Sequence, residues 1–297
     1  ARLQEEKLSH SEKIAFLAQS YVVRATALKT DEVAKQEITE INKKIYDHSD
    51  AGIDSLYETG RQKSLLYFEV MYKILGTKFD HYFFESEVAD SAKETVLKNV
   101  GSVFTESDGA VVFKGEEYDK KLHTRVFVNN EGLPTYEAKE LGLAKLKYDT
   151  YPYDTSIVIT GNEINEYFKV LLKAMSLVFP ELAVKTKHIS HGMLKLPEGK
   201  MSSRTGNVIT ATTLINQVAE KVLEKMKEGD IPESERGIIA ETIGLGAIKY
   251  TILRQAIGGD IIFDFDKSIS FEGDSGPYLQ YSVVRANSIL KKVEGVI

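Results

Sequence analysis

Helical and strand-like segments alternate between residues 135 and 189 of the sequence, and this pattern limits the possible folds. It predicts a helix over 135–147, a strand over 156–160, a helix over 163–178 and a strand over 185–189. Short β-branched strands that alternate with helices are typical of parallel βαβ units. The run Ile157-Val158-Ile159 is apolar throughout, as in a strand that helices cover on both faces. The sequence therefore predicts an α/β fold built on a parallel sheet.

The part of the chain before this alternation is predicted to be mainly helical. Ser9 and Glu12 form a capping-box pattern at the start of a first helix. Further helices are expected over 31–46 and over 61–75, with Gly76 as the natural end of the latter. The aromatic run 79–84 predicts a strand, and helical sequence follows to about residue 99. The β-rich runs 110–113 and 125–128 then predict a hairpin.

The last third of the chain has helical patterns again. Helices are expected over 211–227 and 234–256, with Gly258-Gly259 as a break after the second. A strand-like run over 261–265 and a glycine-rich turn over 273–276 come next. A last helix is predicted to begin near Pro277, because proline is favourable in a first helical turn.

Composition excludes several classes of protein. The 297 residues contain no cysteine, which excludes disulfides, zinc fingers and thiol catalysis. The net charge of −6 argues against a generally basic nucleic-acid coat protein and leaves a local phosphate site open. No apolar run of about 20 residues and no signal peptide occur, so we expect a cytoplasmic location and no membrane partner. The chain begins with Ala1 instead of Met, which suggests a processed chain or a segment of a longer one.

The most informative segment is the loop from Gly199 to Gly206, between a predicted strand and a predicted helix. Its eight residues include two cations, three hydroxyls and two glycines. Glycines allow close backbone approach, hydroxyls donate hydrogen bonds and cations neutralise charge, so such a loop is suited to wrap phosphate. It does not have the spacing of a Walker P-loop. From composition alone, a solvated surface loop remains an alternative.

Four motifs, in order along the chain, are similar to those of one enzyme family. Lys200-Met201-Ser202-Ser203-Arg204 resembles the Lys-Met-Ser-Lys-Ser signature of class I aminoacyl-tRNA synthetases. With His191-Gly192-Met193 before it, the segment resembles arginyl-tRNA synthetases in particular. The other motifs are Ser107-Asp108-Gly109-Ala110, Gly132-Leu133-Pro134-Thr135-Tyr136 and Phe271-Glu272-Gly273-Asp274-Ser275-Gly276-Pro277-Tyr278-Leu279-Gln280-Tyr281 with Arg285.

The resemblance implies a reaction in which arginine and ATP form arginyl-adenylate, and the arginyl group then passes to tRNA(Arg). It implies that Lys200 and Arg204 supply charge to the ATP phosphates, with Ser202 and Ser203 as hydrogen-bond donors. The fourth position of the general signature is Lys, whereas here it is Ser203. The same resemblance places an ATP-binding surface at a short set of residues: His191, Gly192, Met193, Lys200 and Met201. Mg²⁺ is expected to arrive with ATP and to be held mainly by its phosphates, with no protein metal site.

A pair of residues is suited to the arginine side chain. Tyr136 and Glu140 are four residues apart on a predicted helix, so both lie on one face. A phenol ring packs against a planar guanidinium and a carboxylate accepts it in bidentate fashion. The family has Tyr and an acid at matching positions, although the acid is usually Asp. A further polar position of the family falls at Ile164 in this sequence. The nearest polar substitutes are Asn162 and Glu163, and Glu163 is predicted to complete the pocket.

The second class I signature, His-x-Gly-His, does not occur in the sequence. We therefore expect a fragment that holds the second half of a Rossmann-like class I synthetase catalytic domain, with a helical insertion and C-terminal helices. The predicted divisions are a helical and hairpin insertion over 1–130, the catalytic half over 131–209, a helical stem-contact or connecting region over 210–275, and the first anticodon-binding helix over 276–297.

An incomplete parallel sheet leaves an unpaired edge and an apolar face. The fragment alone is therefore expected to be inactive in aminoacylation and to self-associate. Two alternatives remain open: a non-catalytic synthetase-like binding module, and a class I synthetase for another amino acid.

Overall fold

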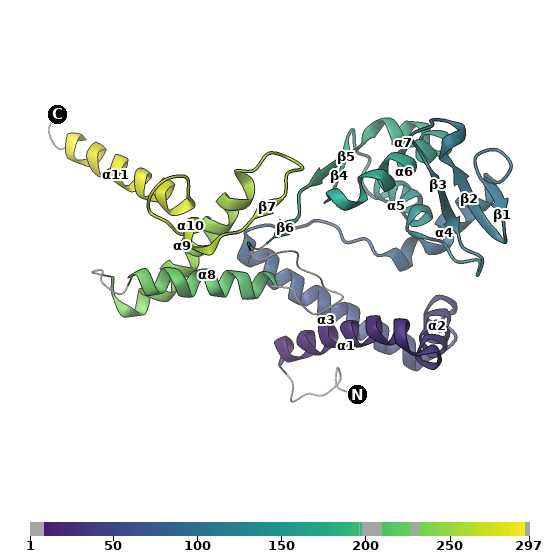
Figure 1. Ribbon diagram of the computed structural model, residues 1–297, viewed down its shortest axis with the longest axis horizontal. Coiled ribbons are helices and arrows are strands. Elements are labelled where there is room, and N and C mark those ends of the chain that lie inside the picture. The colour runs from purple at the N-terminus through teal and green to yellow at the C-terminus, as the bar shows by residue number, and fades with distance from the viewer. Residues whose placement is uncertain (1–8, 196, 198–209, 227–230, 295–297) are drawn as a thin grey trace. The chain divides into compact units, whose positions relative to one another are not determined.

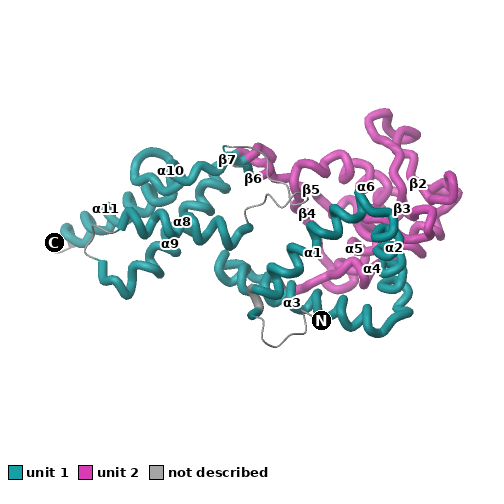
Figure 2. Tube along the Cα trace, turned by 60° about the horizontal axis from the view of Figure 1, so that its bottom comes forward, with its two compact units in different colours: residues 1–79, 194–255, 261–297 teal, residues 80–193, 256–260 magenta. Residues whose placement is uncertain are grey.

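The computed structural model describes residues 9–195, 197, 210–226 and 231–294 (Figure 1). The chain divides into two compact units (Figure 2). Unit 1 comprises residues 1–79, 194–255 and 261–297, and unit 2 comprises residues 80–193 and 256–260. Among the described residues, no helix has both the length and the hydropathy that crossing a membrane requires.

Unit 1 begins with three helices whose ends follow local sequence signals. They are α1 (His10–Thr30), α2 (Glu32–Asp47) and α3 (Ala51–Leu75). Ser9 caps α1 and forms the predicted capping box with Glu12. The Asp31 side chain accepts hydrogen bonds from two backbone N–H groups at the start of α2. Gly76 ends α3 with a left-handed φ of 69°, a conformation that costs glycine little.

The rest of unit 1 packs around a second set of helices. These elements are β6 (Leu194–Lys195), α8 (Ala211–Lys225), α9 (Glu233–Leu253), β7 (Ile261–Ile262), α10 (Phe265–Ser268) and α11 (Gly276–Glu294). Their apolar core centres on Val218, Ala247 and Phe263, which are fully buried. Gly244 lets α9 approach α8 closely, because a Cβ there would lie 3.2 Å from the backbone nitrogen of Ala219. Met71 of α3 joins the same core.

Unit 2 is an α/β body with two small sheets. Strands β1 (Thr105–Ser107), β2 (Ala110–Lys114) and β3 (Thr124–Val128) form an antiparallel sheet in that order. Strands β4 (Ser156–Gly161) and β5 (Thr186–His191) pair in parallel. The helices are α4 (Glu85–Lys98), α5 (Tyr136–Thr150), α6 (Asn165–Val178) and α7 (Pro180–Lys185), with short 3-10 helices at Gly115–Glu117 and Asn162–Ile164.

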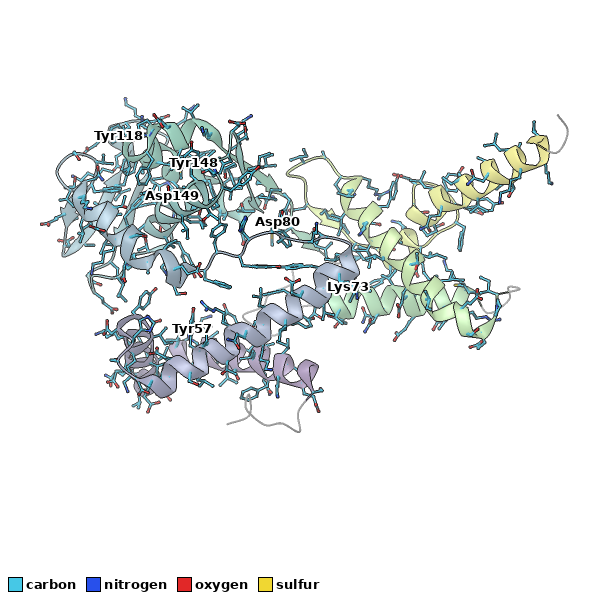
Figure 3. All side chains as sticks on the ribbon, turned by 180° about the vertical axis from the view of Figure 1, so that it is seen from behind. Tyr57, Lys73, Asp80, Tyr118, Tyr148 and Asp149 are labelled. Atoms are coloured by element: carbon cyan, nitrogen blue, oxygen red, sulfur yellow. The ribbon has the colours of Figure 1, made fainter. Side chains whose placement is uncertain are left out.

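Three phenylalanine rings form the centre of the unit 2 core. Phe104, Phe113 and Phe127 are almost completely buried, and the rings of Phe104 and Phe127 are 4.8 Å apart between centroids. Tyr118 stacks on Phe113 with nearly parallel rings, and Figure 3 shows where Tyr118 lies in unit 2. Leu141 of α5 belongs to the same core, so the antiparallel sheet and the helices share one apolar interior.

Several sequence predictions about these elements are wrong in detail. Residues 79–84 form no strand; Phe79 instead packs its ring edge-on against Tyr72, and Phe84 lies at the start of α4. The aromatic composition was thus used for local ring contacts and not for strand pairing. Helix α3 begins at Ala51, ten residues before the predicted start, because Asp50 caps it. The strand predicted over 261–265 is reduced to Ile261–Ile262.

The parallel pair itself is as the sequence predicts, whereas its outer face is not covered. Val158 faces the core, but Ile157 and Ile159 are 54% and 68% exposed. Alternation of side chains along a strand explains this difference, since among the described residues the core covers the face of β4 that carries Val158. The prediction of helices on both faces of this strand therefore does not hold within unit 2.

Candidate functional site

The turn from β3 into α5 fixes the position of Tyr136. The Asn129 side chain accepts hydrogen bonds from the backbone N–H groups of Glu131 and Leu133, and Gly132 has a left-handed φ of 74°. Thr135 then anchors the helix to the strand, because its hydroxyl donates to the Val126 carbonyl over 2.8 Å. This local geometry gives Gly132 and Thr135 of the motif, and Asn129 before it, separate roles in the turn that positions Tyr136.

All three residues predicted to hold arginine line one pocket. Tyr136 and Glu140 reach it from α5, and Glu163 reaches it from the short 3-10 helix after β4. The pocket has a volume of about 420 Å³. The remaining lining residues are Arg125, Thr160, Ile164, Glu166, Tyr167 and Phe168. The structure thus brings Tyr136 and Glu163, which are 27 residues apart in the sequence, to the same pocket.

The pocket carries an excess of negative charge. Three carboxylates line it, those of Glu140, Glu163 and Glu166. Burial raises the pKa of Glu140, whereas the nearby Lys147 lowers it by a smaller amount. Burial also lowers the pKa of Lys147. A carboxylate that is desolvated in this way gains more from a cationic ligand than one in open solvent.

The cation in the wall, Arg125, is already paired. Its Nη1 donates to Glu137 Oε1 over 2.9 Å, and its guanidinium carbon lies 5.2 Å from the centre of the Tyr167 ring. Its Nε donates to His123 over 3.0 Å. Glu137 is buried, so the ion pair neutralises a charge that would otherwise be costly. A carboxylate and a tyrosine ring therefore already hold one guanidinium here, the same combination that Glu140 and Tyr136 offer to a ligand.

The family's further polar position is occupied by Ile164 in this chain, so this part of the pocket wall is apolar. Ile164 lines it together with Glu163. Asn162 does not take part, because its side-chain amide donates instead to the carbonyl of Gly258 over 3.3 Å. Of the two polar neighbours considered from sequence, only Glu163 is among the lining residues.

The predicted ATP-binding residues that the structure describes lie at the carboxyl end of β5. His191 is exposed, and its ring Nδ1 is 2.8 Å from the Gly192 carbonyl oxygen. Gly192 is buried against the 256–260 segment, where a Cβ would lie 2.5 Å from the Asp260 backbone nitrogen. The Met193 N–H donates to Asp260 Oδ1 over 2.9 Å. Ligands in open α/β sheets bind outside the carboxyl ends of strands, so the position suits a nucleotide.

The signature loop lies outside the described residues. The loop contains five candidate residues, none of which is described: Lys200, Met201, Ser202, Ser203 and Arg204. Their roles stay predictions from sequence. Among the residues that are described, no three His, Cys, Asp or Glu side chains gather as a metal site would require.

Sequence reasoning missed Arg125 and Tyr167 as pocket residues. A signal for Arg125 was present, since alternation along β3 puts it on the same side as the buried Phe127. A charge on the inner face of a strand requires a buried partner. Tyr167 carried no such signal, because an aromatic residue at helical spacing is ordinary core composition.

The sequence also matches the model of a known protein family. A model of the family described as "tRNA synthetases class I (R), catalytic domain" matches residues 1–265. The chain therefore belongs to the class I tRNA synthetases. Within that class, it belongs to this catalytic-domain family, and the resemblance stated from its motifs is confirmed.

Curated relatives agree with this assignment. The chain is 32% identical over 281 residues to "Arginine--tRNA ligase" of Borrelia hermsii, and the match covers 92% of this chain and 48% of that protein. It is 37% identical over 228 residues to the protein of the same name from Treponema denticola, with 75% of this chain and 38% of that protein covered. The chain thus spans about half the length of the first relative and less than half the length of the second.

Solved structures show the same fold. Arginyl-tRNA synthetase of Thermus thermophilus matches with a TM-score of 0.65 at 20% identity, over 93% of this chain and 55% of that chain. The enzyme of Plasmodium falciparum matches with a TM-score of 0.68 at 18% identity, over 92% of this chain and 50% of that chain. The predicted fold class, an α/β part of a class I synthetase catalytic domain with additional helices, is confirmed.

Proposed function

We propose that this chain carries the arginine-binding part of an arginine–tRNA ligase. The proposed reaction is the ATP-dependent formation of arginyl-adenylate and pyrophosphate, followed by transfer of the arginyl group to tRNA(Arg). The family match supports the class of reaction. The observation that carries the choice of arginine is the gathering of Tyr136, Glu140 and Glu163 around one pocket of suitable charge.

The pocket chemistry favours a long cationic side chain. Glu140 offers two oxygens to a guanidinium. Tyr136, a residue that is 67% exposed, offers its ring, and Lys139 Nζ already lies 5.6 Å from the centre of that ring. Arg125 is neutralised by Glu137, and Glu166 is paired with Lys169, so the attraction of the pocket for cations comes from Glu140 and Glu163. A planar guanidinium uses both a bidentate carboxylate and a stacking ring, whereas an ammonium uses the carboxylate as a point charge only.

The activation step is assigned to the signature loop and the strand end. The arginine carboxylate attacks the α-phosphate of ATP, pyrophosphate leaves, and Mg²⁺ enters with the nucleotide. We assign neutralisation of the phosphates to Lys200 and Arg204 and hydrogen-bond donation to Ser202 and Ser203. The nucleotide surface includes His191 and the backbone near it, together with Met201. In an enzyme with the full length of the relatives, Lys200→Ala is expected to slow ATP–pyrophosphate exchange by about tenfold or more. The reason is that one charge-assisted contact is worth roughly 1.5–3 kcal/mol.

Further proposals concern the domain divisions, the location, the self-association and the isolated activity of the chain. The division into 1–130, 131–209, 210–275 and 276–297, the cytoplasmic location and the self-association of the chain stay predictions. The purified 297-residue chain is expected to show no aminoacylation by itself. Robust charging of tRNA(Arg) by the chain, free of host enzyme, would overturn that expectation.

Binding of free L-arginine to the chain tests the proposal directly. Isothermal titration calorimetry at neutral pH compares L-arginine with L-citrulline, whose side chain has a similar shape and no charge. Arginine is expected to bind at least tenfold more tightly, because a charge-assisted hydrogen bond contributes roughly 1.5–3 kcal/mol. Glu140→Gln is expected to remove most of this preference.

The matched control is Glu94→Gln, which removes an exposed carboxylate of α4 in the same unit. It is expected to leave arginine binding unchanged. Equal affinity for arginine and citrulline, or arginine binding that survives Glu140→Gln intact, would refute the pocket assignment. ATP–pyrophosphate exchange can also be measured with each of the twenty amino acids in an enzyme that has the full length of the relatives. This measurement separates arginine from other amino-acid substrates.

A further inference from the structure

His188 lies directly behind the wall of the arginine pocket. Its ring stacks on the Phe168 ring, with centroids 3.9 Å apart and planes within 3° of parallel. Its Nε2 lies 2.7 Å from the Thr160 hydroxyl. Both Phe168 and Thr160 line the pocket, whereas His188 does not. The imidazole therefore contacts the pocket through two of its wall residues, one apolar and one polar.

The Thr160 hydroxyl has two partners and a single proton. It lies 3.1 Å from the Gly161 carbonyl oxygen and 2.7 Å from His188 Nε2. When Nε2 is unprotonated, it accepts the threonine proton. When Nε2 carries a proton, it donates to the threonine oxygen, and the threonine proton turns to the Gly161 carbonyl. The direction in which the Thr160 hydroxyl points therefore depends on whether Nε2 carries a proton. In the neutral ring with its proton on Nδ1, Nε2 accepts, whereas in the charged ring it donates.

The surroundings of the ring favour its neutral form. Burial lowers the pKa of His188. Within the described part of the chain, the hydrogen-bond partner of the ring is the uncharged Thr160. Strand β4 carries no titratable side chain. The titratable groups on the other elements around it are Glu166, Tyr167, Lys169 and Lys173 on α6, Glu181 and Lys185 on α7, and, at the pocket, Arg125 with its partner His123, Glu140 and Glu163.

We propose that His188 is a positioning residue that couples arginine binding to protonation. This inference rests on the proposed function of the pocket. The neutral ring holds Thr160 and Phe168 in place, and the pocket then accepts a guanidinium. In the neutral ring with its proton on Nδ1, addition of a proton to Nε2 reverses the Thr160 hydrogen bond and places a positive charge behind the pocket wall. Arginine binding is therefore expected to weaken as His188 becomes charged.

The expected size of the effect follows from Coulomb's law. Two unit charges about 10 Å apart at an effective dielectric constant of about 20 repel enough to change affinity by roughly tenfold. The coupling is reciprocal, so saturation with arginine is expected to lower the pKa of His188 by the matching amount. Glu140 also loses its charge in acid, and the test must therefore follow His188 itself.

The experiment is an NMR titration of the histidine rings in the 297-residue chain, with and without saturating L-arginine. We expect the His188 resonance to titrate at lower pH when arginine is bound. His81, which is exposed on the segment before α4, is the internal control and is expected not to change. A His123→Gln background separates the contribution of the ring that is bound to Arg125. This measurement needs no substitution at His188.

A pair of variants tests the two roles of the ring. His188→Gln removes the titration and keeps a hydrogen-bonding group near Thr160, whereas His188→Phe keeps an aromatic ring against Phe168 and loses the hydrogen bond. We expect the His188 component of the pH dependence, measured between about pH 8 and pH 5.5, to disappear in both variants. Gln is expected to retain more of the affinity at the higher pH.

The outcomes are distinguishable. Arginine binding with an unchanged His188 titration would overturn this inference and leave the proposed function standing. Failure of the wild-type chain to bind arginine at any pH would overturn the proposed function and the inference with it. A pH dependence of arginine affinity that is the same in His188→Gln and in the wild type would also refute the role of His188.

Discussion

Replacement of Gly192 by alanine probes how the end of β5 is held. Gly192 does not have a left-handed φ, so alanine is tolerated by the backbone torsions at this position. Space is the obstacle, because the new Cβ would lie 2.5 Å from the Asp260 backbone nitrogen and closer still to the Gly259 carbonyl group. All of these atoms belong to backbone, so no side-chain rotation relieves the overlap. The 256–260 segment must therefore move away from β5.

The cost of that movement can be bounded from the contacts that break. Undocking the segment removes the hydrogen bond from the Met193 N–H to Asp260 Oδ1 (2.9 Å) and that from Asn162 to the Gly258 carbonyl (3.3 Å). At roughly 1 kcal/mol each, their loss amounts to about 2 kcal/mol. Forced overpacking costs a similar 1–3 kcal/mol or so. We therefore expect Gly192→Ala to lower the free energy of unfolding by about 2 kcal/mol.

Urea denaturation with linear extrapolation measures the global change, and hydrogen exchange at the Met193 amide measures the local one. The Met193 amide is expected to lose protection. Gly237→Ala is the control, since no atom lies within 4 Å of its Cβ position on α9, and it is expected to raise stability by about 0.5–1 kcal/mol. Gly192→Ala with stability within about 0.5 kcal/mol of wild type and full Met193 protection would refute the reasoning.

Three further predictions concern the core and the pocket. Arg125→Met leaves the buried Glu137 unpaired and is expected to cost about 3 kcal/mol in urea denaturation, and added Glu137→Gln should recover most of this. Because burial raises the pKa of Glu140, the folded state binds its proton more tightly, and the stability that this provides is lost as pH rises through the raised pKa. Glu140→Gln is therefore expected to unfold at a higher temperature than wild type at pH 7–8, with the difference vanishing near pH 4. Phe127→Ala removes a fully buried ring and is expected to cost about 3–5 kcal/mol, measured by urea denaturation against wild type.

Local chemistry made much of the secondary structure predictable. The cap at Ser9, the helix end at Gly76 and the β2–β3 hairpin were all readable from neighbours in the sequence, whereas Asp31, predicted as the first residue of its helix, is its cap. The parallel pairing of β4 with β5 was also readable, because apolar β-branched runs alternate with helical sequence. Residues 79–84 were not, since the same aromatic composition serves a strand or local ring packing.

Local sequence patterns were enough to identify the family, to place the ends of most helices within a few residues and to put Tyr136 and Glu140 on one helix face. These depend on hydrogen bonds and side-chain spacing within a few residues along the chain. Three contacts became known from the folded chain alone: Glu137 neutralises Arg125, His188 lies behind Thr160, and the 256–260 segment packs against Gly192. Such pairings depend on burial of charge and close packing between segments distant in sequence, and no local pattern encodes which distant partner will satisfy them.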